Sequence, residues 1–230
     1  MTRIAVRAAA AGILFAAAAA SCATAPGTFP VGDPDYPLPA VGTYRPYTLS
    51  EAQSLITSGG PTLVGKKVLA VNGVTYPNDC TGLVRAAYAF ASIDLAQRFG
   101  RYQGNGVRRL YMTLRDERLL YAVHHPMPGD IVFWDNTYDA NGNGRPDDML
   151  THVGVVISAE PDGSIRYLHY NYRLGPVLDH MNLTLPEVDT SSAGSPVNSH
   201  LRMGGSPKYE GTNAAQLFRV FGKGYDIRIP

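Results

Sequence analysis

The sequence lacks the features that nucleic-acid-binding, zinc-dependent or membrane-spanning proteins would need. Basic and acidic residues nearly balance at a formal net charge of +1, so there is no basic field for nucleic acid. The pattern His-Glu-x-x-His is absent, and the two cysteines and six histidines form no cluster with the spacing of zinc ligands. The uncharged run at residues 8–20 has 13 residues, fewer than the roughly 20 that span a bilayer.

That short apolar run is the centre of an export signal. Arg3 and Arg7 precede it, and it ends at the small residues Ala20 and Ser21. We therefore expect residues 1–21 to be a signal peptide that is removed on export. Its removal takes away two arginines and changes the formal charge from +1 to −1, which again argues against nucleic acid as a partner.

Cys22 follows the small residues directly, and Ala19-Ala20-Ser21-Cys22 resembles a bacterial lipobox, with alanine where leucine is most common. The resemblance implies a diacylglycerol on the Cys22 thiol and an acylated new amino terminus, which together exceed the two signals that stable membrane anchoring needs. The alternative is ordinary secretion with cleavage at a nearby alanine. Because Ala23 is not the aspartate that retains lipoproteins at the inner membrane, we expect an outer-membrane lipoprotein that faces the periplasm.

The mature chain is predicted to be a tether followed by one domain. Residues 22–47 are rich in proline and glycine and lack apolar periodicity, which is typical of a tether. Residues 48–230 are long enough for one core, and we expect residues 183–211 to form a surface loop within a loop-rich carboxy-terminal extension. The patterns predict helices at residues 48–58 and from residue 80 to about 99, and extended segments at residues 69–74, 131–134, 152–157 and 164–170. A helix followed by close antiparallel strands indicates an α+β fold.

Cys80 is placed where a cysteine can become reactive. It follows a turn signal and begins the predicted helix, so the free amides and the dipole of the first turn favour a thiolate. Either Asn78 or Asp79 can cap this turn. If Cys22 is acylated, Cys80 has no partner for a disulfide within the chain, although a free cysteine is often only a small buried hydrophobic residue.

Two histidines can serve such a cysteine. His152 begins one predicted strand and His169 lies on the next, and adjacent strands can bring two imidazoles within hydrogen-bonding reach, one as a base and one to fix its tautomer. The remaining histidines flank turns or lie in loop-like sequence, and we expect them at the solvated surface; they are His124, His125, His180 and His200.

Four segments in order resemble the NlpC-type family of cell-wall cysteine peptidases, which share a papain-like α+β fold with the CHAP amidases. Residues 78–84 (NDCTGLV) resemble the family's nucleophile motif at a helix start, and residues 128–134 (PGDIVFW) resemble its Pro-Gly-Asp strand. Residues 151–156 (THVGVV) resemble the strand that carries the catalytic histidine, and residues 167–169 (YLH) the strand that completes the triad. Each segment alone is a weak signal, but together and in this order they are specific.

The resemblance implies a papain-like domain with its nucleophile at the amino terminus of a helix packed on a small antiparallel sheet. It assigns Cys80 as nucleophile, His152 as base and His169 as orienting residue, and it expects a thiolate–imidazolium pair. The 17 residues from His152 to His169 exceed the usual separation, so Asn171 is the alternative third residue. Backbone amides near Cys80, beside Asn78 and Asp79, would hold the oxyanion.

The implied substrate is an amide bond of peptidoglycan, cleaved through an acyl-enzyme without a catalytic cofactor. Whether the enzyme is an endopeptidase or an amidase stays open. Two alternatives also remain: an acyltransferase of the same superfamily, and a non-catalytic scaffold lipoprotein that binds the wall. An intact cysteine and histidine set argues against the scaffold, because binding alone has no need of it.

An insertion at residues 135–150 contains, at residues 139–148, the spacing of a calcium loop. Oxygen-bearing side chains occupy positions 1, 3, 5 and 9, and Gly144 lies at the sharp turn. Position 12, usually a bidentate glutamate, is Leu150, so an aspartate at residue 148 would have to supply the last charge. The predicted ligands of a structural calcium ion are Asp139, Asn141, Asn143, Asp147 and Asp148. The alternative is a solvated loop rich in Asx and glycine residues.

Overall fold

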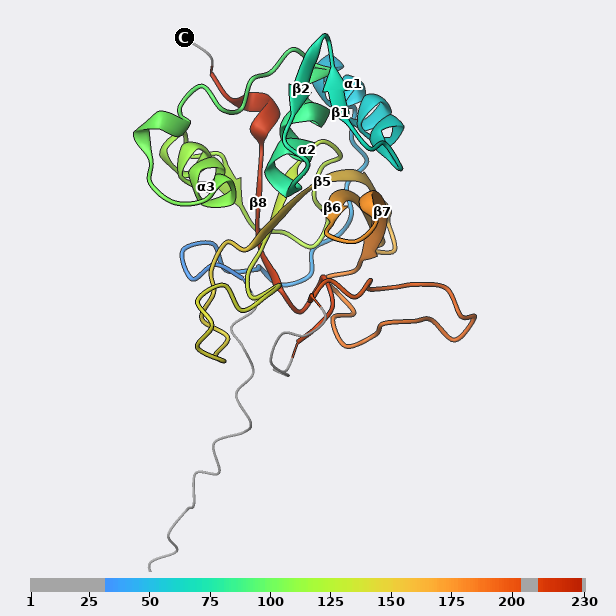
Figure 1. The fold of residues 1–230 in the computed structure, drawn as a ribbon. Helices are drawn as coiled ribbons and strands as arrows, with labels where there is room; N and C mark the ends of the chain where they lie inside the picture. Colours follow the sequence, from blue (N-terminus) through green and yellow to red (C-terminus); the bar gives the residue numbers. More distant parts are fainter. Residues whose placement is uncertain (1–31, 204–210, 229–230) are drawn as a thin grey trace, which may run out of the picture.

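The computed structural model describes residues 32–203 and 211–228, which form an α+β domain (Figure 1). The predicted signal peptide and Cys22 lie outside these residues. Among the helices of the described ranges, none has the length and apolar character needed to cross a membrane.

The described part of the chain contains three α-helices: α1 (Glu51–Gly59), α2 (Cys80–Ala89) and α3 (Gly106–Asp116). Short 3-10 turns occur at Gly60–Leu63, Phe99–Arg101 and Gly224–Asp226. The predicted start of α2 at Cys80 is confirmed, but the helix ends at Ala89, ten residues before the predicted end. α3 is not among the predicted elements, although its buried residues recur at helical spacing: Val107, Leu110, Tyr111 and Leu114.

Two antiparallel sheets accompany the helices. β1 (Leu69–Val71) and β2 (Val74–Tyr76) form a hairpin, so the single extended segment predicted at residues 69–74 is wrong. The chain reverses at Asn72-Gly73, where both residues have positive φ angles of 52° and 77°, as a two-residue hairpin turn requires. The larger sheet has six strands in the order β3-β8-β4-β5-β6-β7. They are β3 (Leu120–Tyr121), β4 (Ile131–Trp134), β5 (His152–Ala159), β6 (Ile165–Asn171), β7 (Gly175–Met181) and β8 (Phe218–Gly222).

Each face of the larger sheet carries its own apolar core. Alternate strand residues such as Phe133 and Val155 pack with the three helices on one face. On the other face, Trp134 and Tyr167 are fully buried, and residues of the extension, including Leu201, cover them. The segment predicted as a surface loop at residues 183–211 therefore closes the second core with its described part, which lies across the sheet from the helices (Figure 1).

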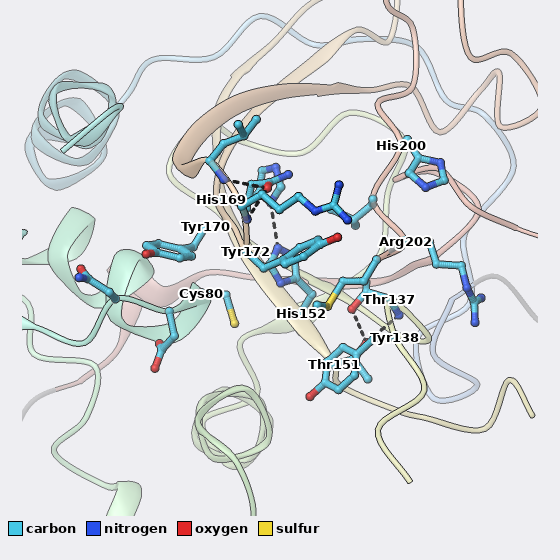
Figure 2. A pocket seen from close by; sticks show the side chains of 17 residues that line it. Cys80, Thr137, Tyr138, Thr151, His152, His169, Tyr170, Tyr172, His200 and Arg202 are labelled. Carbon is cyan, nitrogen blue, oxygen red and sulfur yellow. Dashed lines mark hydrogen bonds between the residues drawn. The ribbon is translucent and has the colours of Figure 1, made fainter. Parts of the chain in front are cut away.

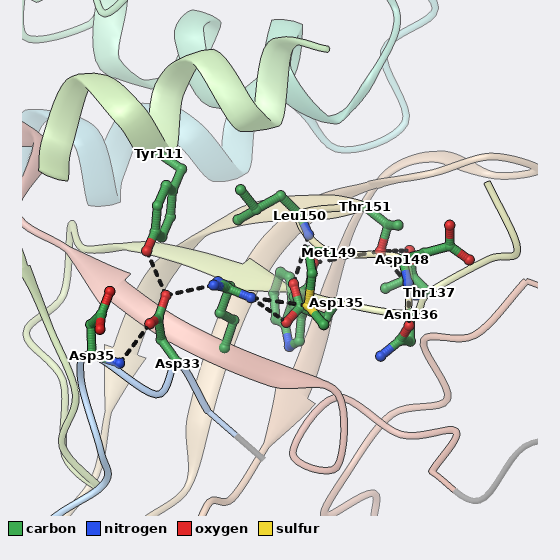
Figure 3. A network of polar contacts seen from close by, with 12 residues as sticks. Asp33, Asp35, Tyr111, Asp135, Asn136, Thr137, Asp148, Met149, Leu150 and Thr151 are labelled. Carbon is green, nitrogen blue, oxygen red and sulfur yellow. Dashed lines mark hydrogen bonds and ion pairs between the residues drawn. The ribbon is translucent and has the colours of Figure 1, made fainter. Parts of the chain in front are cut away.

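Residues 32–47, the described part of the predicted tether, lie on the domain. Asp33 is 2 % exposed, accepts a hydrogen bond from the Tyr111 hydroxyl and forms an ion pair of 2.7 Å with Arg219 on β8. The same guanidinium reaches Asp135 at 2.7 Å, which joins the segment, β8 and the insertion in one buried network (Figure 3). At the far end of the segment, the Tyr47 hydroxyl donates to the Ala159 carbonyl at 3.3 Å. These contacts exclude a free tether over this part of the chain.

Candidate active site

A pocket of about 680 Å³ opens at the amino terminus of α2 (Figure 2). Cys80, His152 and His169 all line it, so the structure brings together the three residues that the sequence singles out. The predicted neighbours Asn78, Asp79 and Asn171 line it as well.

Local sequence fixes Cys80 at the first position of α2. The Asp79 carboxylate accepts a hydrogen bond of 2.7 Å from the amide of Gly82, which is the N-cap interaction expected of this residue. Asn78 does not cap; its amide group donates to the Lys67 carbonyl at 3.0 Å. Gly82 has a steric role, because a Cβ there would lie 2.0 Å from the Pro77 carbonyl oxygen. The turn before the helix can therefore pack closely against its first turn and hold Cys80 in place.

The two histidines are hydrogen-bonded to one another. Nε2 of His152 on β5 lies 2.9 Å from Nδ1 of His169 on β6. His169 is 2 % exposed, and its Nε2 lies 2.9 Å from a carboxylate oxygen of Asp179 on β7. The backbone of Val153, the residue after His152, lies near enough to the Cys80 sulfur to lower its pKa, so the helix terminus and β5 meet at the pocket. The contribution of Asp179 was missed from the sequence.

Asn171, the alternative third residue, has a different role. Its side-chain oxygen accepts hydrogen bonds from the amides of Arg173 at 2.9 Å and Leu174 at 3.2 Å. These bonds stabilise the turn between β6 and β7. His169 is therefore the residue that contacts His152.

Burial shifts the proton equilibrium of the cysteine and its neighbouring histidine in opposite directions. Burial, together with the charge of Asp79, raises the pKa of the Cys80 thiol to about 11. Burial and the adjacent His169 lower the pKa of His152 well below its usual value. The dipole of α2 opposes the first effect by about 0.3–1 kcal/mol, which is less than one pKa unit. The environment therefore favours a neutral thiol beside a neutral imidazole, in contrast to the expected thiolate–imidazolium pair.

The other walls of the pocket come from chain segments beyond the four recognised motifs. Thr137 and Tyr138 belong to the insertion, while His200 and Met203 belong to the carboxy-terminal extension. The Met203 amide donates to the Thr137 carbonyl at 2.7 Å and joins the two walls. His200 is exposed as predicted, but it is exposed at the rim of this pocket.

The other three histidines, predicted at the solvated surface, are each partly buried. His124 and His125 pack with residues 39–47 around a second cavity of about 380 Å³, and Tyr44 meets the ring of His125 edge-on at 5.7 Å. His180 on β7 is also partly buried. These three histidines are therefore less solvated than predicted, because the docked segment and the extension partly cover them.

Hydrogen bonds within the acidic insertion hold its side-chain oxygens close together. Asp139 accepts from the amides of Gly142 at 2.8 Å and Gly144 at 3.0 Å, while Asp147 accepts from the side chains of Asn141 and Asn143. The fifth predicted ligand, Asp148, is 6 % exposed. Within the described residues, no three Asp, Glu, His or Cys side chains converge as a metal site would need. Calcium binding here stays a prediction.

Comparison with known proteins identifies one family. Residues 70–171 match the CHAP domain, a segment that contains α2, α3, β4, β5 and β6, and with them Cys80, His152 and His169. Asp179 and the extension lie beyond the matched segment. No curated protein and no solved structure matches the chain. The match at residues 70–171 supports the papain-like CHAP and NlpC-type family of cell-wall peptidases for this part of the chain.

Proposed function

We propose that the protein is a cysteine hydrolase that cleaves an amide bond of peptidoglycan through an acyl-enzyme on Cys80. The CHAP domain supports a peptidoglycan amidase or peptidase in general terms. The observation that carries the specific proposal is the shared pocket, in which Cys80 at a helix start faces the same cavity as the bonded pair His152 and His169.

The first half-reaction forms a thioester. Since Nε2 of His152 is bonded to His169, its Nδ1 is the nitrogen available to accept a proton. It takes the proton of the Cys80 thiol as the sulfur attacks the amide carbonyl carbon. The carbonyl oxygen becomes an oxyanion, which the Cys80 amide at the start of α2 is suited to stabilise. Collapse of this intermediate breaks the carbon–nitrogen bond, and the proton on His152 passes to the leaving amine.

The second half-reaction restores the enzyme. Water attacks the thioester and gives one proton to His152, the carbon–sulfur bond breaks, and that proton returns to the sulfur. The product is a carboxylic acid, which ionises by releasing its proton to water. Proton transfer during attack suits a pair that is neutral at rest, as burial favours here.

Incubation of the mature protein with purified peptidoglycan, followed by mass identification of released fragments, tests the proposal. Cys80→Ala should lower the cleavage rate at least ~10³-fold, and His152→Ala should have a comparable effect because the proton acceptor is lost. His169→Ala should be milder if this residue only orients the base. The matched control is His180→Ala, which removes an imidazole outside the pocket and should retain wild-type cleavage. Wild-type rates in Cys80→Ala would refute the mechanism.

The same experiment separates the alternatives. An acyltransferase would use the same thioester, but an added amine would then appear in the products in place of water. A scaffold would bind peptidoglycan and release no fragments from it. The masses also identify the bond, because an endopeptidase releases peptide pieces and an amidase separates the peptide from the sugar.

We also infer that a lipid on Cys22 holds the protein at the outer membrane. Because Asp33 is fixed on the domain, only the ten residues between it and Cys22 can act as a linker. At about 3.5 Å per extended residue they span at most ~35 Å. A lipid-anchored domain would then act on the layer of the wall nearest the membrane.

A further inference from the structure

We infer that Asp179 is a positioning residue that sets the tautomers of both histidines and so leaves Nδ1 of His152 free as the base. The inference rests on the function proposed above. It follows from the continuous path of hydrogen bonds that runs from β7 through β6 to β5, with 2.9 Å at each step (Figure 2 shows the histidine pair).

The path can have only one direction when Asp179 is ionised and His169 is neutral. Burial opposes ionisation, but hydrogen bonding and the nearby His169 lower the pKa of Asp179 below its ordinary value. A carboxylate only accepts, so in a neutral His169 the Nε2 atom must carry the hydrogen and the Nδ1 atom must be an acceptor. Nε2 of His152 then donates to that acceptor, which leaves Nδ1 of His152 with a lone pair.

The opposite direction would disable the site. A hydrogen on Nδ1 of His169 would require Nε2 of His152 to accept, which would place the remaining hydrogen of His152 on Nδ1. The nitrogen assigned as base could then take no proton from the Cys80 thiol. The orientation of this path is therefore a condition for catalysis as well as a source of rigidity.

The fold holds Asp179 in place from two sides. In the register of β6 and β7 it lies opposite Tyr167, which puts it diagonally across from His169 on the same face of the sheet. Ser199 of the extension lies near enough to the carboxylate to lower the pKa of Asp179, and its hydroxyl accepts from the His180 amide at 3.0 Å. His169 is 2 % exposed, whereas the side chain of Asp179 is 28 % exposed. The extension therefore contributes to the site through Ser199.

The variant that tests the inference is Asp179→Leu, which removes the acceptor and fills its space with apolar atoms. In protein labelled with ¹⁵N at histidine, NMR distinguishes protonated from unprotonated ring nitrogens, and the spectrum of His152→Gln assigns the signals of His152. Wild-type protein should show Nε2 of His152 protonated and Nδ1 unprotonated, and Asp179→Leu should reverse this pattern. Its peptidoglycan cleavage should fall about 100-fold.

Two further variants guard against a general loss of structure. Asp162→Leu replaces an exposed aspartate in the β5–β6 turn and should keep both the wild-type tautomers and the wild-type rate. Ser199→Ala should lower the rate less than Asp179→Leu, since it only loosens the carboxylate.

If Asp179→Leu fails to fold, the wild-type spectrum still decides, because the opposite tautomer of His152 there would overturn the inference. A folded Asp179→Leu protein whose His152 signals are the same as in the wild type would also overturn the inference. The NMR measurement needs no substrate, so an absence of cleavage in every variant would count against the proposed function alone.

Discussion

Replacing Asp130 with asparagine should stabilise the protein at neutral and alkaline pH. Asp130 ends the Pro-Gly-Asp turn before β4 and is 0 % exposed. Its carboxylate accepts hydrogen bonds from the Tyr121 hydroxyl, from the Met127 amide at 2.7 Å and from the Tyr225 hydroxyl at 3.1 Å. Burial outweighs these bonds and raises the pKa of Asp130 to about 7.

The sign of the effect follows from proton binding. Because the folded-state pKa lies above the ordinary value of 3.8, the folded protein holds more protons than the unfolded chain between about pH 4 and pH 7. The free energy of unfolding therefore falls as the pH rises through this window. The difference between 3.8 and about 7 corresponds to about 4 kcal/mol, an upper limit for the loss. Asparagine resembles the neutral acid and has no such loss.

Urea denaturation of wild type and Asp130→Asn at intervals from about pH 4 to pH 8 measures the effect. The two proteins should have similar stability at the acid end, and the variant should become more stable by up to ~4 kcal/mol at the alkaline end. Subtracting the two curves cancels the titration of other carboxylates. Asp35→Asn, at an exposed aspartate, is the control and should give a flat difference. A flat or inverted difference for Asp130→Asn would refute the reasoning.

Three further predictions concern the thiols and the acidic insertion. Cys22→Ser should move the protein from membrane to soluble fractions, and unchanged membrane association would rule out this anchor. In that variant Cys80 is the remaining thiol, and its alkylation by iodoacetamide should rise about tenfold per pH unit beyond pH 9, because its pKa is raised to about 11; a plateau below pH 8 would contradict this. Millimolar calcium should raise the Tm of chelator-treated wild type but not of Asp139→Ala, and equal Tm values with and without calcium would exclude the site.

The sequence predicts the start of α2 correctly because its signals are local. The Asp79 cap, the glycine at residue 82 and the apolar positions of α2 all lie within a few residues of Cys80. The strands at residues 131–134 and 152–157 are likewise contiguous apolar runs between turn signals. By contrast, β7 contains Pro176, Asp179 and His180, so its composition does not suggest a strand, and it forms because β6 provides a partner along its whole length.

Long-range contacts and burial explain the other differences. Residues 32–47 have the composition of a linker, and only the distant Arg219 and Tyr111 give Asp33 a partner that fixes the segment. Cys80 begins a helix, and this position alone favours a thiolate. The sequence does not show how far the surrounding residues exclude solvent from the thiol, and this burial raises its pKa. Asp179 was missed for the same reason, since its contact with His169 depends on strand register.

The residues that line the pocket come partly from the segment that matches the CHAP domain and partly from segments beyond it. Cys80, His152 and His169 lie inside the CHAP match, whereas Arg173 and His200 at the pocket lie beyond it. Under the proposed function, the matched segment supplies the reacting residues, and the walls beyond it contribute to the choice of bond. Through Ser199 the extension also lies near the carboxylate of Asp179 and lowers its pKa. Under the same proposal, a change in the extension that alters substrate fit should therefore also alter the cleavage rate.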